Sequence, residues 1–531
     1  MAQATLGRGK RQWPDAPQEK PPKTFQFRNF DQGVDLTNAR VDIDDKALSW
    51  CENVVPVGKG ALQLIPHQGA TLATIAAGVS RQFGFNLNIA GVSTPVIITI
   101  NSDGSATQIN RNTGATTAVC GAGGVDTDSD AALWQNTPVL FAGRTTGYKS
   151  WDGTSFAVID ASKTAIAIAV FEGRVWLASP ASRTVTFTAP NTNNDFTAGN
   201  GAGSFIITDD AFPGNITHML SSLEQLWIAG AGAIEAVANV VATGSGGSVI
   251  TTFSITNIVT GLGSSATNSM IGYFRALTFF APFGAYALSG VTPQKLSDKL
   301  DGMIPALTLG NAPAALAVVQ SLPVLCFLVT YTQSLAPSLP RPASGSADAT
   351  KLVLCFTQGK WFFASQGSLT WITTLVNDSG VLEAWGTDGS TVYQLFGDSG
   401  TTAVAYKVQT RLFDFGLSTV QKSVTTLGFE YQSSNPVTPT ITVDNEITSQ
   451  TAGISFGNAL VFINDAGSQL TWFNNALATV TWVAQGMVLS TTGNIGISGY
   501  YIGVTISGTD KPYRIQAVQL TVVDEGELRV L

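Results

Sequence analysis

The chain has 531 residues, of which 12% are charged, and its formal net charge is −8. The charged share is about half of what soluble domains usually carry, so Ser, Thr, Asn, Gln and Gly supply most of the polarity. The acidic balance argues against a protein that coats nucleic acid, because that role needs clustered Lys and Arg. So few charges are typical of a protein whose faces are buried against copies of itself or other subunits.

Residues 1–24 are predicted to form an extended basic arm. Cations outnumber acids in it, and prolines interrupt it: Arg8, Lys10, Arg11, Lys20 and Lys23, against Asp15 and Glu19, with Pro14, Pro17, Pro21 and Pro22. Such a segment cannot bury enough apolar surface to fold alone. Two interpretations stay open, a frayed terminus and a basic tether that docks on an acidic neighbouring subunit. We expect no secretory signal, because the arm has no apolar core.

From residue 25 to residue 406 short strands and tight turns recur every 35 to 50 residues or so, the spacing of β-propeller blades. Residues 276–290 illustrate the unit: an apolar run 276–281, a turn 282–284, a second run 285–288, and a Ser-Gly end. The window 270–288 is the most apolar long one, yet Arg275 and Pro282 interrupt it, so it predicts a buried hairpin and no membrane span. Units at 81–119, 131–159, 165–208, 216–258, 268–304, 314–366 and 371–406 predict six or seven blades, with a closing strand near 61–66.

Two strands share an apolar-Trp-apolar-Ala pattern, Val175–Ala178 and Leu226–Ala229. Strand alternation predicts that Trp176 and Trp227 lie between adjacent blades, where their apolar area holds one sheet on the next.

Residues 407–531 are predicted to form a C-terminal β-sandwich, since strands of sandwich length alternate apolar and polar residues. Between Ile447 and Thr509 the only charged residue is Asp465, which indicates a sheet face packed on another subunit. The acidic end with Asp524, Glu525 and Glu527 is expected to be solvated. The fold class is therefore all-β, a propeller followed by a sandwich, with an N-terminal arm.

Motifs typical of catalysis or metal binding are weak in this sequence, and we predict no catalytic, cofactor-binding or metal-binding residues. His67 and His218 have no nucleophile motif nearby and are interpreted as structural. Asp126, Asp128 and Asp130 have the spacing of a calcium loop, but Ala131 replaces its glycine and no acid follows at the twelfth position, so a solvated loop is favoured. Asp-Gly pairs at 103, 152 and 388 suit hairpin turns better than the paired carboxylates of a glycosidase.

The four cysteines, Cys51, Cys120, Cys326 and Cys355, form no CxxC pair and are expected to be reduced. A disulfide between Cys326 and Cys355, on neighbouring predicted strands, stays open.

Several segments in order carry a resemblance. The opening has Phe30, Gly33, Asp35, Ala47, Asn53, Gly60, Leu62 and Gly69; residues 283–303 and 385–397 follow; and Tyr406–Gly416 with Lys422 leads out of the repeats. Together they resemble the β-propeller proteins that short-tailed bacteriophages place below the portal, the tail nozzle or packaged-DNA stabilization proteins. His67 and Gln68 stand where a basic residue is common in that family, which is a departure from its pattern.

The resemblance implies a virion protein of the phage tail, made in the host cytoplasm, that assembles into a homo-oligomeric ring, a hexamer. Its partners would be the portal or an adaptor ring, other tail proteins, and packaged DNA that passes without sequence-specific binding. The ring would extend the portal channel and retain or gate the genome, with an acidic lumen that repels phosphates. The alternatives are a carbohydrate-binding or glycoside-cleaving propeller and a host-receptor adhesin.

Overall fold

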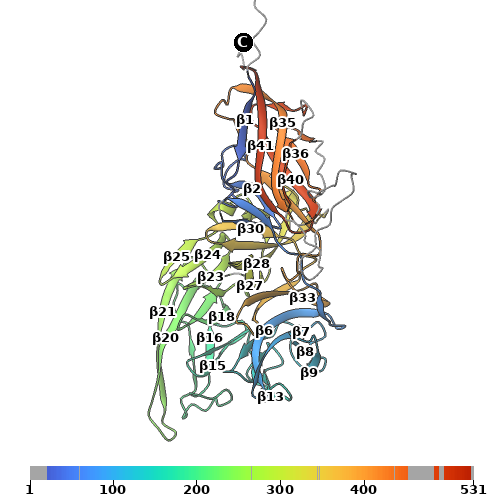
Figure 1. Ribbon diagram of the computed structural model, residues 1–531. Coiled ribbons are helices and arrows are strands. Elements are labelled where there is room, and N and C mark those ends of the chain that lie inside the picture. Colours follow the sequence, from blue (N-terminus) through green and yellow to red (C-terminus); the bar gives the residue numbers. More distant parts are fainter. Residues whose placement is uncertain are drawn as a thin grey trace, which may run out of the picture.

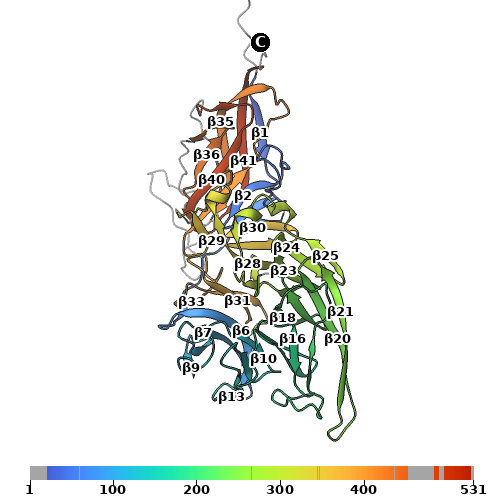
Figure 2. The same ribbon diagram turned by 180° about the vertical axis from the view of Figure 1, so that it is seen from behind.

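The computed structural model describes residues 21–58, 60–264, 266–343, 345, 347–433, 435, 437–452, 484–489 and 495–527. The arm residues 1–20, Asp465 and the strands expected between 453 and 483 therefore lie outside the described residues. The molecule is elongated, with an array of small sheets at one end and the strands nearest the C-terminus at the other (Figures 1 and 2).

Among the described residues, six four-stranded antiparallel sheets, together with four antiparallel strands of a ten-stranded sheet, form the seven blades of a β-propeller. The first three blades are β6 (Val79–Ile89), β7 (Val92–Asn101), β8 (Ala106–Asn110) and β9 (Thr116–Cys120); β10 (Asp130–Leu133), β11 (Val139–Ala142), β12 (Tyr148–Trp151) and β13 (Phe156–Asp160); and β14 (Ala167–Phe171), β15 (Arg174–Ala178), β16 (Thr184–Phe187) and β17 (Gly203–Ile206). The next two are β18 (Ile216–Ser222), β19 (Gln225–Gly230), β20 (Ala233–Thr243) and β21 (Ile250–Thr260); and β22 (Ile271–Tyr273), β23 (Ala276–Ala281), β24 (Gly284–Ser289) and β25 (Thr292–Lys295).

Blade six consists of β27 (Ala314–Val319), β28 (Leu322–Thr332), β29 (Ala349–Thr357) and β30 (Lys360–Ala364), with β26 (Leu307–Thr308) beside β28. Blade seven consists of β31 (Trp371–Val376), β32 (Leu382–Thr387), β33 (Thr391–Gln394) and β5 (Thr71–Thr74). Within the part of the chain that the structure describes, three short 3-10 helices occur in the connections: η1 (Asp298–Leu300), η2 (Ile304–Ala306) and η3 (Gln333–Leu335). The predicted repeats and the hairpin at 276–288 are confirmed, and the number of blades is seven.

The predicted closing strand at 61–66 is wrong. The ring closes through β5, which pairs with β33 and so brings an N-terminal strand to the last blade. The segment at 61–66 instead contains β4 (Ala61–Leu64), which pairs with β3 (Val54–Val57) and with β41 (Arg514–Glu527). Both segments are short and rich in apolar residues, so only their distant pairing partners distinguish them.

The strands outside the propeller form two groups. One sheet contains β3, β4, β41, β35 (Val420–Ser433) and β38 (Ala484–Leu489), with β1 (Lys23–Phe27) beside β41 and β39 (Ser498–Gly499) beside β35. The other group is β2 (Leu48–Glu52), β34 (Val404–Thr410), β40 (Gly503–Asp510), β36 (Thr440–Asp444) and β37 (Ser449–Thr451). Because β2 also pairs with β30, this second group continues the sheet of blade six.

Apolar side chains hold neighbouring blades together, as the tryptophan pattern predicts. Trp176 of blade three shares a buried cluster with Leu226 and Ile228 of blade four. Trp227 of blade four shares another with Leu277 and Phe279 of blade five. The largest cluster runs from blade six into both groups of strands outside the propeller, so these strands and the propeller share a core.

Candidate functional site

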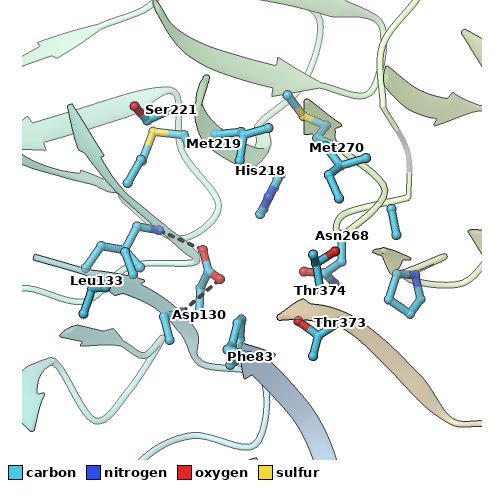
Figure 3. A pocket seen from close by; sticks show the side chains of 18 of the residues that line it. Phe83, Asp130, Leu133, His218, Met219, Ser221, Asn268, Met270, Thr373 and Thr374 are labelled. Carbon is cyan, nitrogen blue, oxygen red and sulfur yellow. Dashed lines mark hydrogen bonds between the residues drawn. The ribbon is translucent and has the colours of Figure 1, made fainter. Parts of the chain in front are cut away.

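A cavity of about 430 Å³ lies at the centre of the propeller, and the first strand of every blade contributes residues to its wall (Figure 3). The strands that meet there are β6, β10, β14, β18, β22, β27 and β31. A volume in this range suits a small molecule. The seven blades therefore converge on this central cavity, which is the candidate site.

Asp130 and His218 are the ionisable side chains among the described residues that line this cavity. The Asp130 carboxylate accepts hydrogen bonds from the backbone N–H groups of Ala131 and Ile168, both at 3.0 Å. Because Ile168 belongs to β14, this carboxylate satisfies a backbone donor of the next blade. Asp130 thus ties blade two to blade three.

His218 extends from β18 toward the centre of the cavity (Figure 3). Burial lowers the pKa of His218; the Asp130 carboxylate opposes this effect, and the Arg81 guanidinium adds to it. The imidazole is accordingly neutral at neutral pH, with one ring nitrogen able to accept a hydrogen bond. The sequence interpretation placed His218 in a structural role and did not foresee that β18 directs it into a central cavity.

Hydrogen bonds between blades close the cavity wall near blade seven. Thr374 accepts a bond of 2.6 Å from the Leu316 N–H of blade six. Gln82 of blade one donates to the Trp385 carbonyl of blade seven at 2.6 Å, while its Oε1 is buried without a hydrogen-bond partner among the described residues. The wall can therefore orient a small polar ligand.

Glycoside cleavage needs two carboxyl groups, and Asp130 is the one acid of the described wall.

The three alternating aspartates do not converge on a metal site. The Asp126 carboxylate accepts bonds from Thr145 and Thr146, and Asp128 pairs with Arg144, while Asp130 faces the central cavity. Burial alone would raise the pKa of Asp126, but the hydrogen bonds from Thr145 and Thr146 hold it below the ordinary value. Within the described ranges no three His, Cys, Asp or Glu side chains gather in a way that could hold a metal ion.

The Asp-Gly pairs occupy hairpin turns. Gly104, Gly153 and Gly389 have φ of 77°, 98° and 98°, which glycine adopts without strain. In each case the preceding aspartate accepts hydrogen bonds from residues just after the turn. These carboxylates thus stabilise local turns.

Cys326 and Cys355 face one another across β28 and β29, and their Sγ atoms are 4.0 Å apart. Both are free thiols, as are Cys51 and Cys120. His67 lies near blade seven, where its Nδ1 is 3.2 Å from the Gln68 carbonyl oxygen.

A long hairpin formed by β20 and β21 extends beyond the other strands of the propeller (Figures 1 and 2). It exposes three aliphatic side chains, Val241 at 51%, Ile250 at 65% and Ile255 at 41%. Residues 236–274 contain no Asp, Glu, Lys or Arg. The sequence prediction treated this stretch as an ordinary blade and did not use the run without charge, although exposed apolar surface is a general mark of interaction sites.

Seven blades, each with four antiparallel strands, surround one cavity and define a β-propeller. No protein-family model matches the chain, and no curated protein matches it. Among solved structures, the chain is similar to the structure of U3-55K, with 11% identity and a TM-score of 0.37 over 62% of this chain and 99% of that one. It is also similar to the crystal structure of the RRP9 WD40 repeats, with 10% identity and a TM-score of 0.38 over 63% and 99% of the two chains. Similarity at these levels transfers no function to this chain. None of the described helices has the length and apolar character to cross a membrane.

Proposed function

We propose that this protein is a structural component of a virion, a subunit of the tail nozzle or head-tail connector ring of a short-tailed phage. The observation that carries the proposal is the β20–β21 hairpin, which projects from the propeller, carries no charged residue from residue 236 onward, and exposes Val241, Ile250 and Ile255. An exposed strand pair of this kind risks aggregation unless a partner covers it. A neighbouring copy in a ring is the partner we propose.

The connection between the propeller and the remaining strands supports a rigid building block. We take the two groups of strands outside the propeller as the faces of a C-terminal β-sandwich, because buried residues of both, such as Phe429 of β35 and Val504 of β40, belong to one cluster. The sheet of blade six continues through β2 into this part. Such a rigid unit would hold the two ends of a tail ring at fixed positions relative to each other.

The genome would pass through the lumen between copies. The cavity inside each propeller, about 430 Å³, has the size of a small-molecule site and is far too small for a duplex. The chain has a net charge of −8, so a ring of such subunits would repel phosphates on balance and DNA would slide past without tight binding. The neighbours along the tail would be the portal or an adaptor ring and other tail proteins. The subunit would be made in the host cytoplasm and function in the virion.

A carbohydrate-binding or glycoside-cleaving propeller is the alternative, together with a host-receptor adhesin. The central cavity with Asp130 and His218 favours ligand binding over cleavage, because the described wall lacks a second carboxylate. We therefore propose a non-enzymatic role.

Native mass spectrometry and electron microscopy of the purified full chain test the ring. We expect a closed hexamer. Because charges on the hairpin would oppose burial, the double variant Val241→Asp/Ile250→Asp should shift the population to monomer by tenfold or more, at about 1.4 kcal/mol for each factor of ten. The control Val158→Asp changes an exposed valine on β13 of another blade, 58% accessible, and should leave the hexamer intact. A wild-type chain that stays monomeric and hydrolyses glycosides would contradict the proposal.

A further inference from the structure

An aromatic groove of about 400 Å³ lies at the end of β1, away from the propeller cavity. Its floor consists of four phenylalanines, Phe25 and Phe27 from β1 and Phe413 and Phe415 from the segment after β34. The ring centroids of Phe27 and Phe413 are 4.1 Å apart, and those of Phe25 and Phe415 are 4.4 Å apart. Phe413 is buried, while the other three rings are only half-buried and leave apolar area facing the groove.

The groove is held in shape by its own neighbours. Arg411 lies 5.5 Å from the centroid of the Phe413 ring and pairs with Asp45 at 2.5 Å. Phe415 has a φ of 52°, a conformation that aromatic residues rarely adopt, and it brings the ring against Phe25. The rings are therefore arranged before any ligand arrives.

Carboxylates lie along one rim of the groove. Asp45 and Asp414 line it, and the Asp45 side chain is 76% exposed. Asp42 and Asp44 are exposed on the same short segment as Asp45. The cations that line the groove are Arg28, which pairs with Glu430 at 3.0 Å, and Lys46. A ligand with apolar rings and a positive charge at its ends suits this surface.

The first 20 residues of the chain contain a matching pattern. Arg11, Pro14, Pro17 and Lys20 recur at intervals of three residues. A polyproline II segment has three residues per turn, so this spacing places all four side chains on one ridge, two prolines between two cations. Pro-x-x-Pro segments characteristically dock in grooves lined by aromatic rings.

We propose that residues 11–20 of one copy of this chain dock in the aromatic groove of a second copy. Pro14 and Pro17 would pack on the exposed phenylalanine rings, and the flanking cations would face the carboxylate rim. Pro21 and Pro22 follow directly, and they restrict the backbone before β1 to extended conformations, which disfavours a sharp return of the arm onto the groove of its own copy. This docking rests on the proposed ring, because it requires a second copy of the chain.

Photo-crosslinking of the full chain tests this docking. A photoreactive benzoylphenylalanine replaces Trp13, and preparations labelled with nitrogen-14 and nitrogen-15 are mixed before irradiation. We expect crosslinked peptides that contain residues 25–29 or 413–416 and that combine the two isotopes. The triple variant Arg11→Ala/Pro14→Ala/Pro17→Ala should reduce their yield roughly tenfold, while the matched variant Gln12→Ala/Ala16→Ser/Gln18→Ala, off the ridge, should retain it.

The outcomes separate this proposal from the ring itself, because native mass is recorded on the same samples. Intact rings whose crosslinks fall elsewhere, combine no isotopes, or respond equally to the two triple variants would overturn the docking and leave the ring standing. A monomer without mixed-isotope crosslinks would overturn both. Asp414→Asn on the rim removes the charge but keeps an acceptor for the Gly416 N–H, so it should lower the yield, and an unchanged yield would count against the charged contact.

Discussion

Ser365 donates a hydrogen bond of 2.6 Å to the Glu52 carboxylate, which joins the end of β2 to the residue after β30. The other oxygen of Glu52 accepts from the Trp50 indole at 3.0 Å and from the Ala343 N–H at 2.7 Å. Glu52 is fully buried, and burial raises its pKa despite these three donors. Blade six and the strands outside the propeller therefore meet at one buried polar group.

Replacement of this carboxylate should weaken the junction. Glu52→Ala leaves three donors without their acceptor, two of them buried, and we expect the free energy of unfolding to fall by about 3 kcal/mol, near 1 kcal/mol for each bond. Glu52→Gln keeps an acceptor oxygen for two donors, and the Ser365 hydroxyl can rotate, so it should cost about 1 kcal/mol. Calorimetry measures the difference, with the exposed Glu224→Ala as a neutral control. Equal stability of all three variants would contradict the role of Glu52.

Glu235 should make stability depend on pH. It is buried on β20, its Oε2 has no partner among the described residues, and burial, together with nearby Asp209, raises its pKa to about 7. Between the ordinary value of 4.5 and about 7, the folded chain holds a proton that the unfolded chain releases, so stability falls as pH rises through this window.

Glu235→Gln removes this component. At pH 8 the variant should be more stable than the wild type by about 1–3 kcal/mol, because only the wild type then buries an ionised carboxylate whose Oε2 lacks a partner, and the two should converge near pH 4. Urea unfolding at a series of pH values measures this, and Glu224→Gln serves as the exposed control. A wild-type curve parallel to that of Glu235→Gln across the whole series would disprove the assignment.

The contact between the first and last blades depends on a glycine. A Cβ at Gly84 of β6 would lie 2.2 Å from the Thr374 carbonyl oxygen of β31. Gly84→Val should therefore force blades one and seven apart and destabilise the protein by about 3 kcal/mol. Gly121→Val is the matched control, because a Cβ there would have no neighbour within 4 Å. Thermal unfolding midpoints that shift equally for both variants would show that this contact does not hold the ring.

The cysteines should differ in reactivity. Cys51, Cys326 and Cys355 are buried, and burial raises the pKa of Cys51 and of Cys355. Burial also raises the pKa of Cys120, but this thiol is partly exposed and therefore accessible to a reagent. Since the thiolate is the reactive form, iodoacetamide at pH 8 should label Cys120 first in the native protein and the other three only after denaturation. Mass spectrometry of the peptides measures the order, and a native disulfide between Cys326 and Cys355 would refute the prediction.

The local sequence was sufficient to predict the strands, the turns and part of the packing between blades. Alternating apolar residues and Asp-Gly turns predict the hairpins, because strand period and turn conformation depend on neighbouring residues. The pattern around Trp176 and Trp227 likewise predicts the inter-blade core, which the structure confirms. The identity of each blade thus follows from short-range information.

Contacts between residues that lie far apart in the sequence could be identified only from the folded structure. The segment at 61–64 and β5 at 71–74 look alike locally, but only β5 closes the ring. Its partner β33 lies more than 300 residues further along the chain, so no local pattern distinguishes the two segments. Asp130 and His218 share a cavity for the same reason, since the blades that carry them converge only after the ring closes. Pairing register and a common cavity depend on side chains of partner strands, and these contacts have no counterpart in a local stretch of sequence.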